Sequence, residues 1–526
     1  MKFLIKPFAE IMIKSKPVRK RYLRILQTNI KLGLKDIEPE IKVHLFWDKL
    51  EVNYIGELAE NKIIQVRKIL SRTPGVESFL EVQAFVLPTS PQPSPLKERG
   101  QEQNQINKII FDFVFEKARD FYADKIEGKS FVCRVKRSGN HDFRSIDLER
   151  YVGGGLLQNA QKSRVDVKTP DITVSIEVKD ENLFIVKDIF SGIGGYPIGT
   201  QDKVLSLISG GFDSGVSTFQ MMKRGARVDF LFFNLGGSAH ELGVKQVASY
   251  LSKNFSAGYS AQFVTIPFED VVAELIKNIN SKYRAIILKR LFLMVADRLA
   301  SEYNYYALIK GDSLGQVSSQ TLKNMFIIDK ASSTLVLRPL IAYNKQEIID
   351  ITQKIGTYSF ACNMPEYCGV VSDKPSTGAK LEKVLKEEEK FDFTLLEKAI
   401  ENKKVERVRD MLKEYNSPHP NPLPEGEGIA TNEIEICYVP GENEVIIDIR
   451  EEEKINKSPL LVDGVEVLQI PFFDINHKFK DLDMSKIYLL YCDKGVISNL
   501  HAHYLKEKGF INVKVYRPLE KGCKIK

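Results

Sequence analysis

The residues most suited to chemistry form a glycine turn, Ser209-Gly-Gly-Phe-Asp-Ser214, directly after the apolar run Val204–Ile208. The run predicts a short buried strand, and Gly210 and Gly211 allow backbone angles that a Cβ atom would forbid. A helix beginning near Asp213 would direct free N–H groups and its positive dipole end at a ligand over the turn, which favours phosphate. No Gly-Lys-Ser/Thr triplet follows, so this is not a Walker-type loop. The alternative is a glycine-rich turn without a ligand.

A second glycine turn follows the apolar stretch Tyr306–Lys310. Gly311 and Gly315 allow close backbone approach, and polar side chains follow them at Gln316, Ser319, Gln320 and Thr321. Lys289 is a cation on the otherwise apolar helical stretch Ala285–Glu302, where a lysine that extends its head group to solvent is the alternative. These residues offer polar contacts to a ligand that carries phosphate and is held over the first turn.

Two further charged residues have candidate roles at this ligand. Asp213 would orient Mg²⁺ or the reacting phosphate, or it would only cap the helix. Lys345 would neutralise charge that builds on the α-phosphate, or it would be a surface lysine beside a helix start. Leu207 and Ile208 can present backbone edges to adenine.

Two cysteines stand where thiol chemistry is plausible. Cys368 lies on a glycine turn, and Cys492 directly follows the apolar strand Ile487–Tyr491. A loop that closes into a helix after Cys492 would surround the sulfur with N–H donors, which lower a thiol pKa and would stabilise a persulfide anion. The alternative, a buried structural thiol, fits poorly with the polar Asp493 and Lys494 that follow. The six cysteines include no C-x-x-C pair, which argues against structural zinc.

Basic residues gather in the first half of the chain. The candidates for RNA contact beside an exposed turn are Arg134, Lys136, Arg137 and Arg150. A net charge of +7 permits a nucleic-acid partner without proving one. The basic start of the helical stretch Pro17–Leu32 is equally well explained as a solvated helix face. No apolar run is long enough for a membrane span and no signal peptide is evident, so we expect a cytoplasmic protein without a membrane partner.

The elements that must position these residues differ along the chain. Residues 1 to about 187 show mixed strands and helices, and residues after 200 alternate strand and helix. This alternation predicts an open parallel sheet with helices on both faces and a ligand at the carboxyl ends of its strands. We expect a charged helical connector over 382–414 and a smaller α/β unit over 433–526. Two related proline-rich insertions, at about 87–105 and 416–432, are too proline-rich for helix or interior strand, with proline-rich interaction ligands as the alternative.

Several motifs resemble known families. Ser209–Ser214 resembles the PP-loop of ATP pyrophosphatases, and the stretches 136–143 and 149–155 resemble the RNA-binding THUMP domain. Residues 1–400, with the block Gly311–Thr321, resemble the tRNA 4-thiouridine synthases (ThiI), and Tyr491–Ser498 with Val445–Arg450 resembles a rhodanese domain. The resemblance implies a multidomain α/β fold: ferredoxin-like (1–60) and THUMP (61–189) α+β domains, a doubly wound parallel-sheet PP-loop domain (190–400), a linker (401–432) and a small α/β rhodanese domain (433–526).

The same resemblance implies site residues and a reaction. ATP would be bound by Leu207, Ile208, Ser209, Gly210, Gly211, Ser214, Lys289, Gly311 and Gln320. Cys492 would accept sulfur from a cysteine desulfurase, O4 of uridine 8 of tRNA would be adenylated with release of pyrophosphate, and Cys368 would form a disulfide with Cys492. The persulfide would also serve thiazole formation for thiamine through a sulfur-carrier protein.

Two alternative functions are also compatible with the sequence. A PP-loop ligase acting on a small molecule would fit the ATP motifs, although no glutaminase-like stretch is present. An RNA-binding protein with an independent rhodanese tail would fit the flanking modules, although the intact turn and both cysteines argue against it. The sequence leaves open whether two copies form a homodimer.

Overall fold

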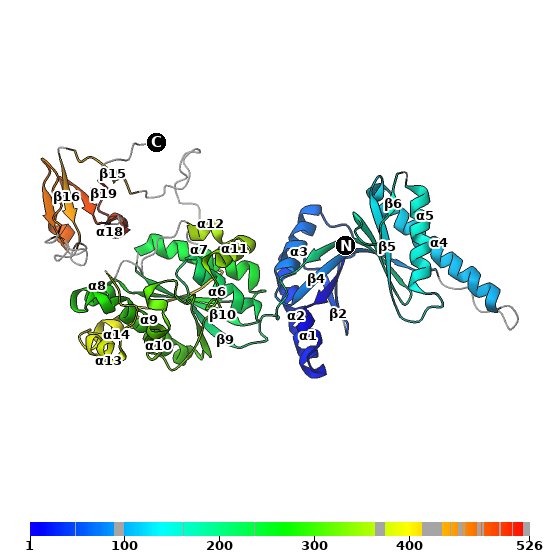
Figure 1. Ribbon diagram of the computed structural model, residues 1–526, viewed down its shortest axis with the longest axis horizontal. Helices are drawn as coiled ribbons and strands as arrows, with labels where there is room; N and C mark the ends of the chain where they lie inside the picture. Colours follow the sequence, from blue (N-terminus) through cyan, green and yellow to red (C-terminus); the bar gives the residue numbers. More distant parts are fainter. Residues whose placement is uncertain are drawn as a thin grey trace. The chain divides into compact units, whose positions relative to one another are not determined.

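The computed structural model describes residues 1–47, 49–88, 99–160, 162–235, 237–362, 374–412, 434–441, 443–450, 455, 458–470, 475, 478–493, 496–507 and 509–518 (Figure 1). Cys368, Cys523, Lys494 and most of both proline-rich insertions therefore lie outside the described residues. The described chain forms two compact units, Met1–Thr200 and Gln201–Lys526.

The first unit contains one continuous eight-stranded sheet with the order β2-β3-β1-β4-β8-β7-β5-β6. Its strands are β1 (Lys2–Pro7), β2 (Lys42–Leu45), β3 (Leu50–Asn53), β4 (Val76–Val86), β5 (Ser130–Ser138), β6 (Arg164–Val165), β7 (Ile172–Lys179) and β8 (Asn182–Ser191). Strand β4 is long enough to pair with β1 near its start and with β8 along most of its length. The two halves of this unit therefore share a sheet although each has its own core.

Each half of the sheet is covered by its own helices. The first core packs α1 (Ala9–Met12), α2 (Lys16–Leu34) and α3 (Glu60–Arg72) against β1, β3 and the start of β4. The second packs α4 (Arg99–Ile126) and α5 (Ser145–Asn159) against β5, β7 and β8. Because Val66 and Leu70 of α3 lie in the first core, this helix belongs structurally with the residues before it. The domain boundaries themselves stay predictions.

The second unit contains a six-stranded sheet with the order β13-β12-β9-β10-β11-β14. Its parallel strands are β9 (Lys203–Leu207), β10 (Arg227–Asn234), β11 (Gln262–Pro267), β12 (Ala307–Ile309) and β13 (Leu335–Leu337). One face carries α8 (Glu269–Asn278), α9 (Ser281–Tyr303), α10 (Leu322–Asp329), α13 (Leu381–Glu388) and α14 (Phe393–Glu401). The other carries α6 (Phe212–Lys223), α7 (Gly237–Phe255), α11 (Lys345–Ile355) and α12 (Tyr358–Cys362). The predicted doubly wound sheet is confirmed.

One prediction about this unit is confirmed only in part. The stretch 382–414, predicted as a helical connector, contains the helices α13 and α14, but β14 (Lys404–Arg407) pairs antiparallel with β11 and extends the sheet. Its Glu406 and Glu241 of α7 hold the buried ammonium of Lys245 at 2.6 and 2.8 Å. Two carboxylates around one buried lysine compensate its desolvation, so the polar strand is fixed to α7 as well as to β11.

A third, five-stranded sheet has the order β15-β19-β18-β16-β17. Its strands are β15 (Ile436–Cys437), β16 (Glu444–Asp448), β17 (Val467–Gln469), β18 (Ile487–Tyr491) and β19 (Val513–Tyr516), all parallel to their neighbours. Helix α18 (Val496–Glu507) packs on β18 and β19. This is the small α/β unit that the sequence predicts.

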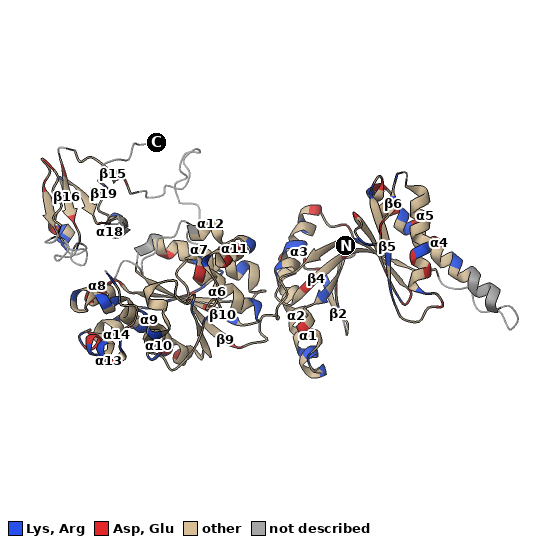
Figure 2. Cartoon of the chain, in the orientation of Figure 1, with Lys and Arg blue, Asp and Glu red and all other residues tan. Residues whose placement is uncertain are grey.

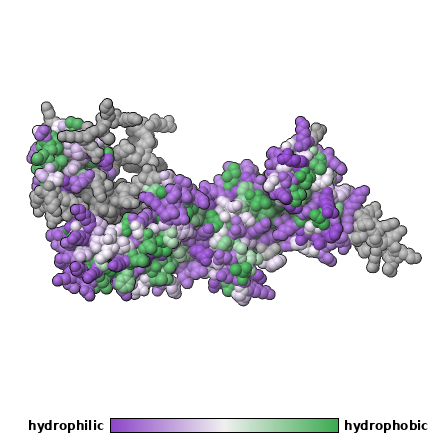
Figure 3. Space-filling model, viewed as in Figure 1, coloured by the Kyte–Doolittle hydropathy of each residue, from purple (hydrophilic) through white to green (hydrophobic). Residues whose placement is uncertain are grey.

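Hydrophilic residues form most of the viewed surface, with hydrophobic residues in scattered groups (Figure 3). No helix in the described part of the chain combines the length and the apolar character required to span a bilayer.

Candidate functional site

The glycine turn joins β9 to α6 as predicted. Gly210 has a φ of +81°, a conformation that side chains other than glycine rarely adopt. Ser214, in the first turn of α6, closes the turn: its Oγ accepts from the Ser209 N–H at 3.2 Å and donates to the Gly211 carbonyl at 3.2 Å. The hydroxyl of Ser214 therefore holds the shape of the turn.

The second glycine turn lies against the first. A Cβ atom on Gly311 would stand 2.7 Å from the carbonyl carbon of Asp213 and 2.9 Å from the amide nitrogen of Ser214. No side chain fits in this space, so only glycine lets the end of β12 approach the first turn of α6. The structure thus brings together the two turns that are separated by about a hundred residues in the sequence.

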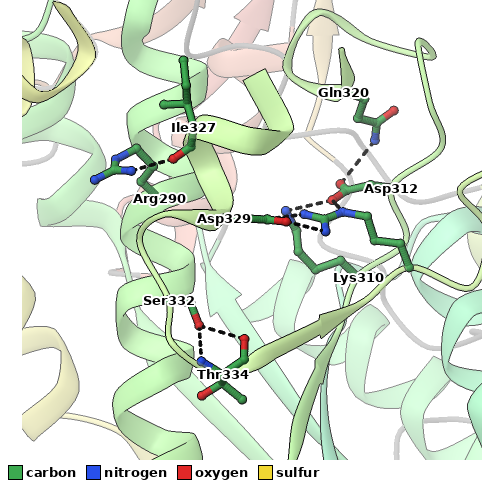
Figure 4. A network of polar contacts seen from close by, with 9 residues as sticks. Arg290, Lys310, Asp312, Gln320, Ile327, Asp329, Ser332 and Thr334 are labelled. Carbon is green, nitrogen blue, oxygen red and sulfur yellow. Dashed lines mark hydrogen bonds and ion pairs between the residues drawn. The ribbon is translucent and has the colours of Figure 1, made fainter. Parts of the chain in front are cut away.

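A buried ionic cluster follows Gly311 (Figure 4). Asp312 lies 2.9 Å from the Lys310 ammonium and 3.0 Å from Nε of Arg338, and both Lys310 and Asp312 are only 5% exposed. The other side of the Arg338 guanidinium binds both carboxylate oxygens of Asp329 at 2.5 and 2.8 Å. Although burial opposes it, the cations Lys310, Lys289 and Arg338 together hold the pKa of Asp312 far below its usual range. Asp312 is therefore a stable anion shared by several cations.

The predicted ATP residues Gln320 and Lys289 both reach this cluster. Gln320 donates its side-chain Nε2 to Asp312 at 3.4 Å, and its buried Oε1 has no hydrogen-bond partner in the described part of the chain. Lys289, half-buried on α9, lowers the pKa of both Lys310 and Asp312 by its charge. The charge of Lys289 therefore acts on the cluster. A lysine with its ammonium in solvent would have only a weak effect, because solvent and salt screen its charge.

Lys345 is exposed at the first residue of α11, after an N-terminal capping box formed by Asn344 and Glu347. The neighbouring segment is tied to the second turn, since Ser313 donates its hydroxyl to the Tyr343 carbonyl at 2.7 Å. This brings the start of α11 near the nucleotide turns. The role of Lys345 in catalysis stays a prediction.

His240 is a site neighbour that sequence reasoning missed. It lies buried on α7, edge-on to the ring of Phe232 with centroids 4.8 Å apart, and it interacts with the backbone of Ser209. Burial lowers its pKa to about 4, although the interaction with Ser209 opposes that shift. His240 is therefore neutral near pH 7 and lies beside Ser209, the first residue of the turn. A lone histidine in a helix carries no sequence signal for this role.

Asp213 could bind a Mg²⁺ ion if phosphate oxygens of the substrate supplied further ligands. Asp213 lies in the first turn of α6, where its backbone meets the second glycine turn at Gly311. Mg²⁺ commonly takes one or two carboxylates plus substrate phosphate oxygens, so a single aspartate here fits the ion. The described residues contain no cluster of three or more His, Cys, Asp or Glu side chains that could hold a metal by themselves.

The sulfur site lies where β18 ends and α18 begins. Sγ of Cys492 accepts from the Ser498 N–H at 3.3 Å and lies 3.4 Å from the Ser498 hydroxyl, while the residue is only 6% exposed. Arg450 binds the buried carboxylate of Asp448 at 2.7 Å and reaches Asp493 at 3.0 Å, which fixes the residue after the cysteine. The predicted donors around the sulfur are therefore present at the helix start, although the thiol is more enclosed than its polar neighbours suggested.

Cys133 and Cys437 are two further thiols in the described part of the chain. Burial raises the pKa of Cys133 to about 12, with the charge of Glu149 acting in the same direction. Burial also raises the pKa of Cys437, whose Sγ lies near the carboxylate of Glu444. Neither forms a thiolate readily, so both fit a structural role better than a catalytic one.

The four predicted RNA contacts lie on β5 and α5. Arg134 and Lys136 are exposed on β5, Arg150 is exposed on α5, and Arg137 donates to the His141 carbonyl at 2.9 Å. Further basic side chains are exposed at the start of α2, among them Lys16, Lys20, Arg21 and Arg24 (Figure 2). The first unit therefore offers several positive regions.

Part of the motif that suggested RNA binding has a packing role. Glu149 accepts the Val135 N–H at 2.8 Å and so covers the edge of β5. A Cβ on Gly155 would lie 2.6 Å from the ring of Phe115, so this glycine lets α5 approach α4. In the other motif, His141 Nε2 lies 2.9 Å from the Asp180 carbonyl, which ties its loop to the β7–β8 turn.

Four family models match the chain. A THUMP domain model matches residues 110–188, and a ThiI ferredoxin-like domain model matches 2–79. A model described as thiamine biosynthesis protein (ThiI) matches 199–393, and a rhodanese-like domain model matches 439–518. The predicted fold class is confirmed.

Relatives match over nearly the full length. A tRNA sulfurtransferase of Escherichia coli is 46% identical over 518 residues, which cover 98% of this chain and 100% of that protein. One of Shigella dysenteriae is 45% identical over the same shares. A crystal structure of a 4-thiouridine synthetase–RNA complex with bound ATP has the same fold, with a TM-score of 0.64 and 23% identity over 77% of this chain and 98% of that one. The chain therefore belongs to the ThiI family of tRNA sulfurtransferases.

Proposed function

We propose that this chain uses ATP to activate a tRNA uridine, at position 8, and replaces its O4 with sulfur to form 4-thiouridine. The observation that supports this most is the match to tRNA sulfurtransferases over 98% of the chain. The phosphate turn and the thiol site both have the local geometry that this chemistry needs. ATP and tRNA are thus substrates of one reaction, and the sulfur arrives on Cys492.

In the activation step, uridine O4 attacks the α-phosphorus of ATP and pyrophosphate leaves. The N–H groups at the start of α6 favour the phosphates, and Ser214 keeps the turn in shape. Asp213 would hold a Mg²⁺ ion, which supplies positive charge beside the phosphates. The AMP group now attached to O4 makes that oxygen a good leaving group.

In the sulfur step, Cys492 carries a persulfide received from a cysteine desulfurase. Its terminal sulfur attacks C4 of the uridine, and AMP leaves with O4. Attack of the Cys368 thiolate on Sγ of Cys492 then breaks the persulfide S–S bond, leaves the sulfur on the uridine and forms a disulfide. A cellular dithiol reductant restores both thiols. In the alternative order, the same attack by Cys368 first releases free sulfide. This sulfide then attacks C4, and the products are the same.

Donors at Cys492 support the persulfide role. The N–H and hydroxyl of Ser498 both approach Sγ, and the start of α18 contributes its positive dipole end. The Arg450–Asp493 ion pair holds the loop at its first residue. We also propose that the persulfide supplies sulfur to a sulfur-carrier protein for thiazole formation in thiamine synthesis, in line with the family model's description.

The first unit would bind the tRNA by its backbone. The exposed Arg134 and Lys136 of β5 and the basic start of α2 provide charges for phosphate contacts that depend on shape and salt but not on sequence.

The decisive experiment is complementation. The chain is expressed in a bacterial strain without 4-thiouridine, and tRNA nucleosides are analysed by mass spectrometry. We expect the intact chain to restore 4-thiouridine and Cys492→Ala and Asp213→Ala to fail, while Cys437→Ala, a matched control thiol outside the catalytic set, succeeds. A folded intact chain that restores nothing would contradict the proposal, and restoration by Cys492→Ala would remove its persulfide step.

A further inference from the structure

The hairpin between β2 and β3 carries two aromatic residues at its tip, Phe46 and Trp47, which are 39% and 74% exposed. Trp47 is the single tryptophan of the chain. Tryptophan is usually well buried, because its ring has a large apolar area. One exposed apolar residue is common on a protein surface, so the surroundings of Trp47 decide whether its ring has a partner.

The residues on either side of Trp47 fix the hairpin to the second half of the sheet. The Phe46 N–H donates to the Lys49 carbonyl at 2.9 Å, which closes the hairpin around its tip. The ammonium of Lys179, at the end of β7, lies 4.9 Å from the centre of the Phe46 ring. The ammonium of Lys49 lies 5.2 Å from the ring of Phe184 on β8. Trp47 is therefore held in a defined place although its own ring is exposed.

The contact with Lys179 brings the tip beside the motif that resembles a THUMP domain. Lys179 pairs in register with Ser138 at the end of β5. The next residue, Asp180, donates its N–H to the Ser138 carbonyl at 3.1 Å, and its own carbonyl lies 2.9 Å from Nε2 of His141. The hairpin tip, the motif loop and the β7–β8 turn, which are far apart in the sequence, therefore lie together.

This end of the sheet also carries basic side chains. Lys136 of β5 lies two positions before Ser138, so Lys136 and Lys179 extend to the same face of the sheet, opposite to the core residue Val135. Glu177, in register with Lys136, is the acid on this part of the face. An aromatic tip beside lysines suits an RNA strand better than an apolar protein surface, because the lysines can contact phosphates.

We propose that the indole ring of Trp47 stacks on an unpaired base of the tRNA, while the basic residues of the motif contact the phosphates. The inference rests on the proposed function, in which tRNA is the substrate. Proteins that bind unpaired RNA combine cations that follow the backbone with aromatic rings on which the bases stack. Because the tip is already fixed through Phe46, little freedom is lost when a base binds.

Fluorescence tests the inference without any substitution, because Trp47 is the single tryptophan. The intact full chain is titrated with unmodified tRNA, and the emission is corrected for absorption by the RNA. We expect stacking to quench the indole and to reduce its access to acrylamide, which reaches the exposed ring in the free chain. Binding of tRNA with unchanged emission and unchanged access of acrylamide overturns the inference.

Two other outcomes separate the alternatives. Shielding of the ring when the chain is concentrated without tRNA would assign Trp47 to a contact between two copies, and it would overturn the inference. An intact chain that binds no tRNA would instead contradict the proposed function.

Trp47→Ala gives the second test, with tRNA affinity measured at several salt concentrations. A stacked base contributes about 5- to 150-fold in affinity, so we expect a loss in that range and recovery of most of it in Trp47→Tyr. The slope of log Kd against log salt should stay unchanged, because a stacked base releases no counterion.

Ile55→Ala is the matched control, since Ile55 is 82% exposed and lies just beyond the other end of β3. It should bind tRNA as the intact chain does. A loss of less than about threefold in Trp47→Ala, or an equal loss in Ile55→Ala, overturns the inference. A salt slope that falls by about one in Trp47→Ala would indicate a lost phosphate contact, and it would overturn the stacking role as well.

Discussion

The nucleotide site and the sulfur site use the same local design, a parallel strand that ends in a loop and a helix, but they are held differently. At the nucleotide site the backbone of Gly311 contacts the backbone of Asp213 and Ser214, and a buried ionic cluster lies behind it. At the sulfur site the Cys492 side chain meets the backbone N–H and the hydroxyl of Ser498, and the Arg450 side chain holds Asp493. Backbone contact leaves little freedom to adjust, whereas side-chain contacts can be replaced in part by their neighbours.

This difference matches the two tasks. Phosphoryl transfer gains most from a fixed arrangement of donors and charges around the phosphate. A persulfide carrier must receive sulfur at one place and deliver it at another, so its loop gains from contacts that can change. Changes at the nucleotide site should therefore have larger effects than changes at the sulfur loop, Cys492 itself excepted.

The largest expected effect is on stability near Asp312. Asp312→Asn removes the carboxylate that compensates buried Lys310 and part of Arg338, which should cost about 3 kcal/mol at pH 7. Hydrogen exchange measured by mass spectrometry on peptides of β12 and β13 would report the loss locally. Lys330→Met should leave the same peptides unchanged. Unchanged exchange in Asp312→Asn would show that the cluster does not hold this edge of the site.

The same residue gives a pH dependence with a defined sign. The folded state holds the pKa of Asp312 below that of an unfolded aspartate, so its stabilisation is complete above about pH 4 and is lost as the pH falls below it. The difference in protection between the intact chain and Asp312→Asn should therefore shrink from pH 6 to pH 3. A constant difference would contradict the assignment.

Gly311→Ala should have the next largest effect. Its Cβ would lie 2.7 Å from the Asp213 backbone, so the two turns must separate. A misplacement of about 1 Å at a catalytic centre costs about 100-fold in rate, and we expect a loss of that order. ATP-dependent release of AMP with tRNA is the measurement. Gly378→Ala is the control, because its nearest atom is a flexible lysine carbon at 3.9 Å. Full activity in Gly311→Ala would contradict the close fit of the two turns.

Sequence reasoning succeeds where the signal is local. The strand Ile487–Tyr491 is predicted to the residue, because an apolar run between turn residues is a local signal. The strand-turn-helix at Ser209–Ser214 was predicted for the same reason, and the structure confirms it.

What sequence reasoning missed depends on contacts between distant residues. Arg338 meets Asp312 across 26 positions, and no spacing rule connects them. Strand β14 has the polar sequence Lys-Val-Glu-Arg and is recognised only through its pairing with β11 and the ion pair between Glu406 and Lys245. Glu149 and Gly155 carry a family motif whose local role, packing around β5 and α4, appears only in the folded sheet.

At the sulfur site Arg450→Met tests whether one side chain holds the loop. It leaves the buried Asp448 carboxylate without its guanidinium and releases Asp493, which should cost about 2 kcal/mol of local stability. Hydrogen exchange in peptides of β16 and β18 should increase, while peptides of β12 stay as in the intact chain. Sulfur transfer should fall but persist, because Ser498 still contacts Cys492. A complete loss of transfer in folded protein would show that the sulfur site depends on a fixed geometry as strongly as the nucleotide site does.

Ser498→Ala should have the smallest effect and gives the sharpest comparison. It removes the hydroxyl oxygen that accepts from the Cys492 thiol at 3.4 Å but keeps the backbone N–H that donates to the sulfur at 3.3 Å, so only one of the two contacts is lost. A single neutral hydrogen bond contributes about 1 kcal/mol, which corresponds to about a fivefold slower formation of the Cys492 persulfide from a sulfur-loaded desulfurase. Mass spectrometry of the full chain follows the added sulfur, with Ser485→Ala, an exposed serine before β18, as the control. A loss as large as that of Cys492→Ala would mean that the hydroxyl, and not the helix start, holds the sulfur.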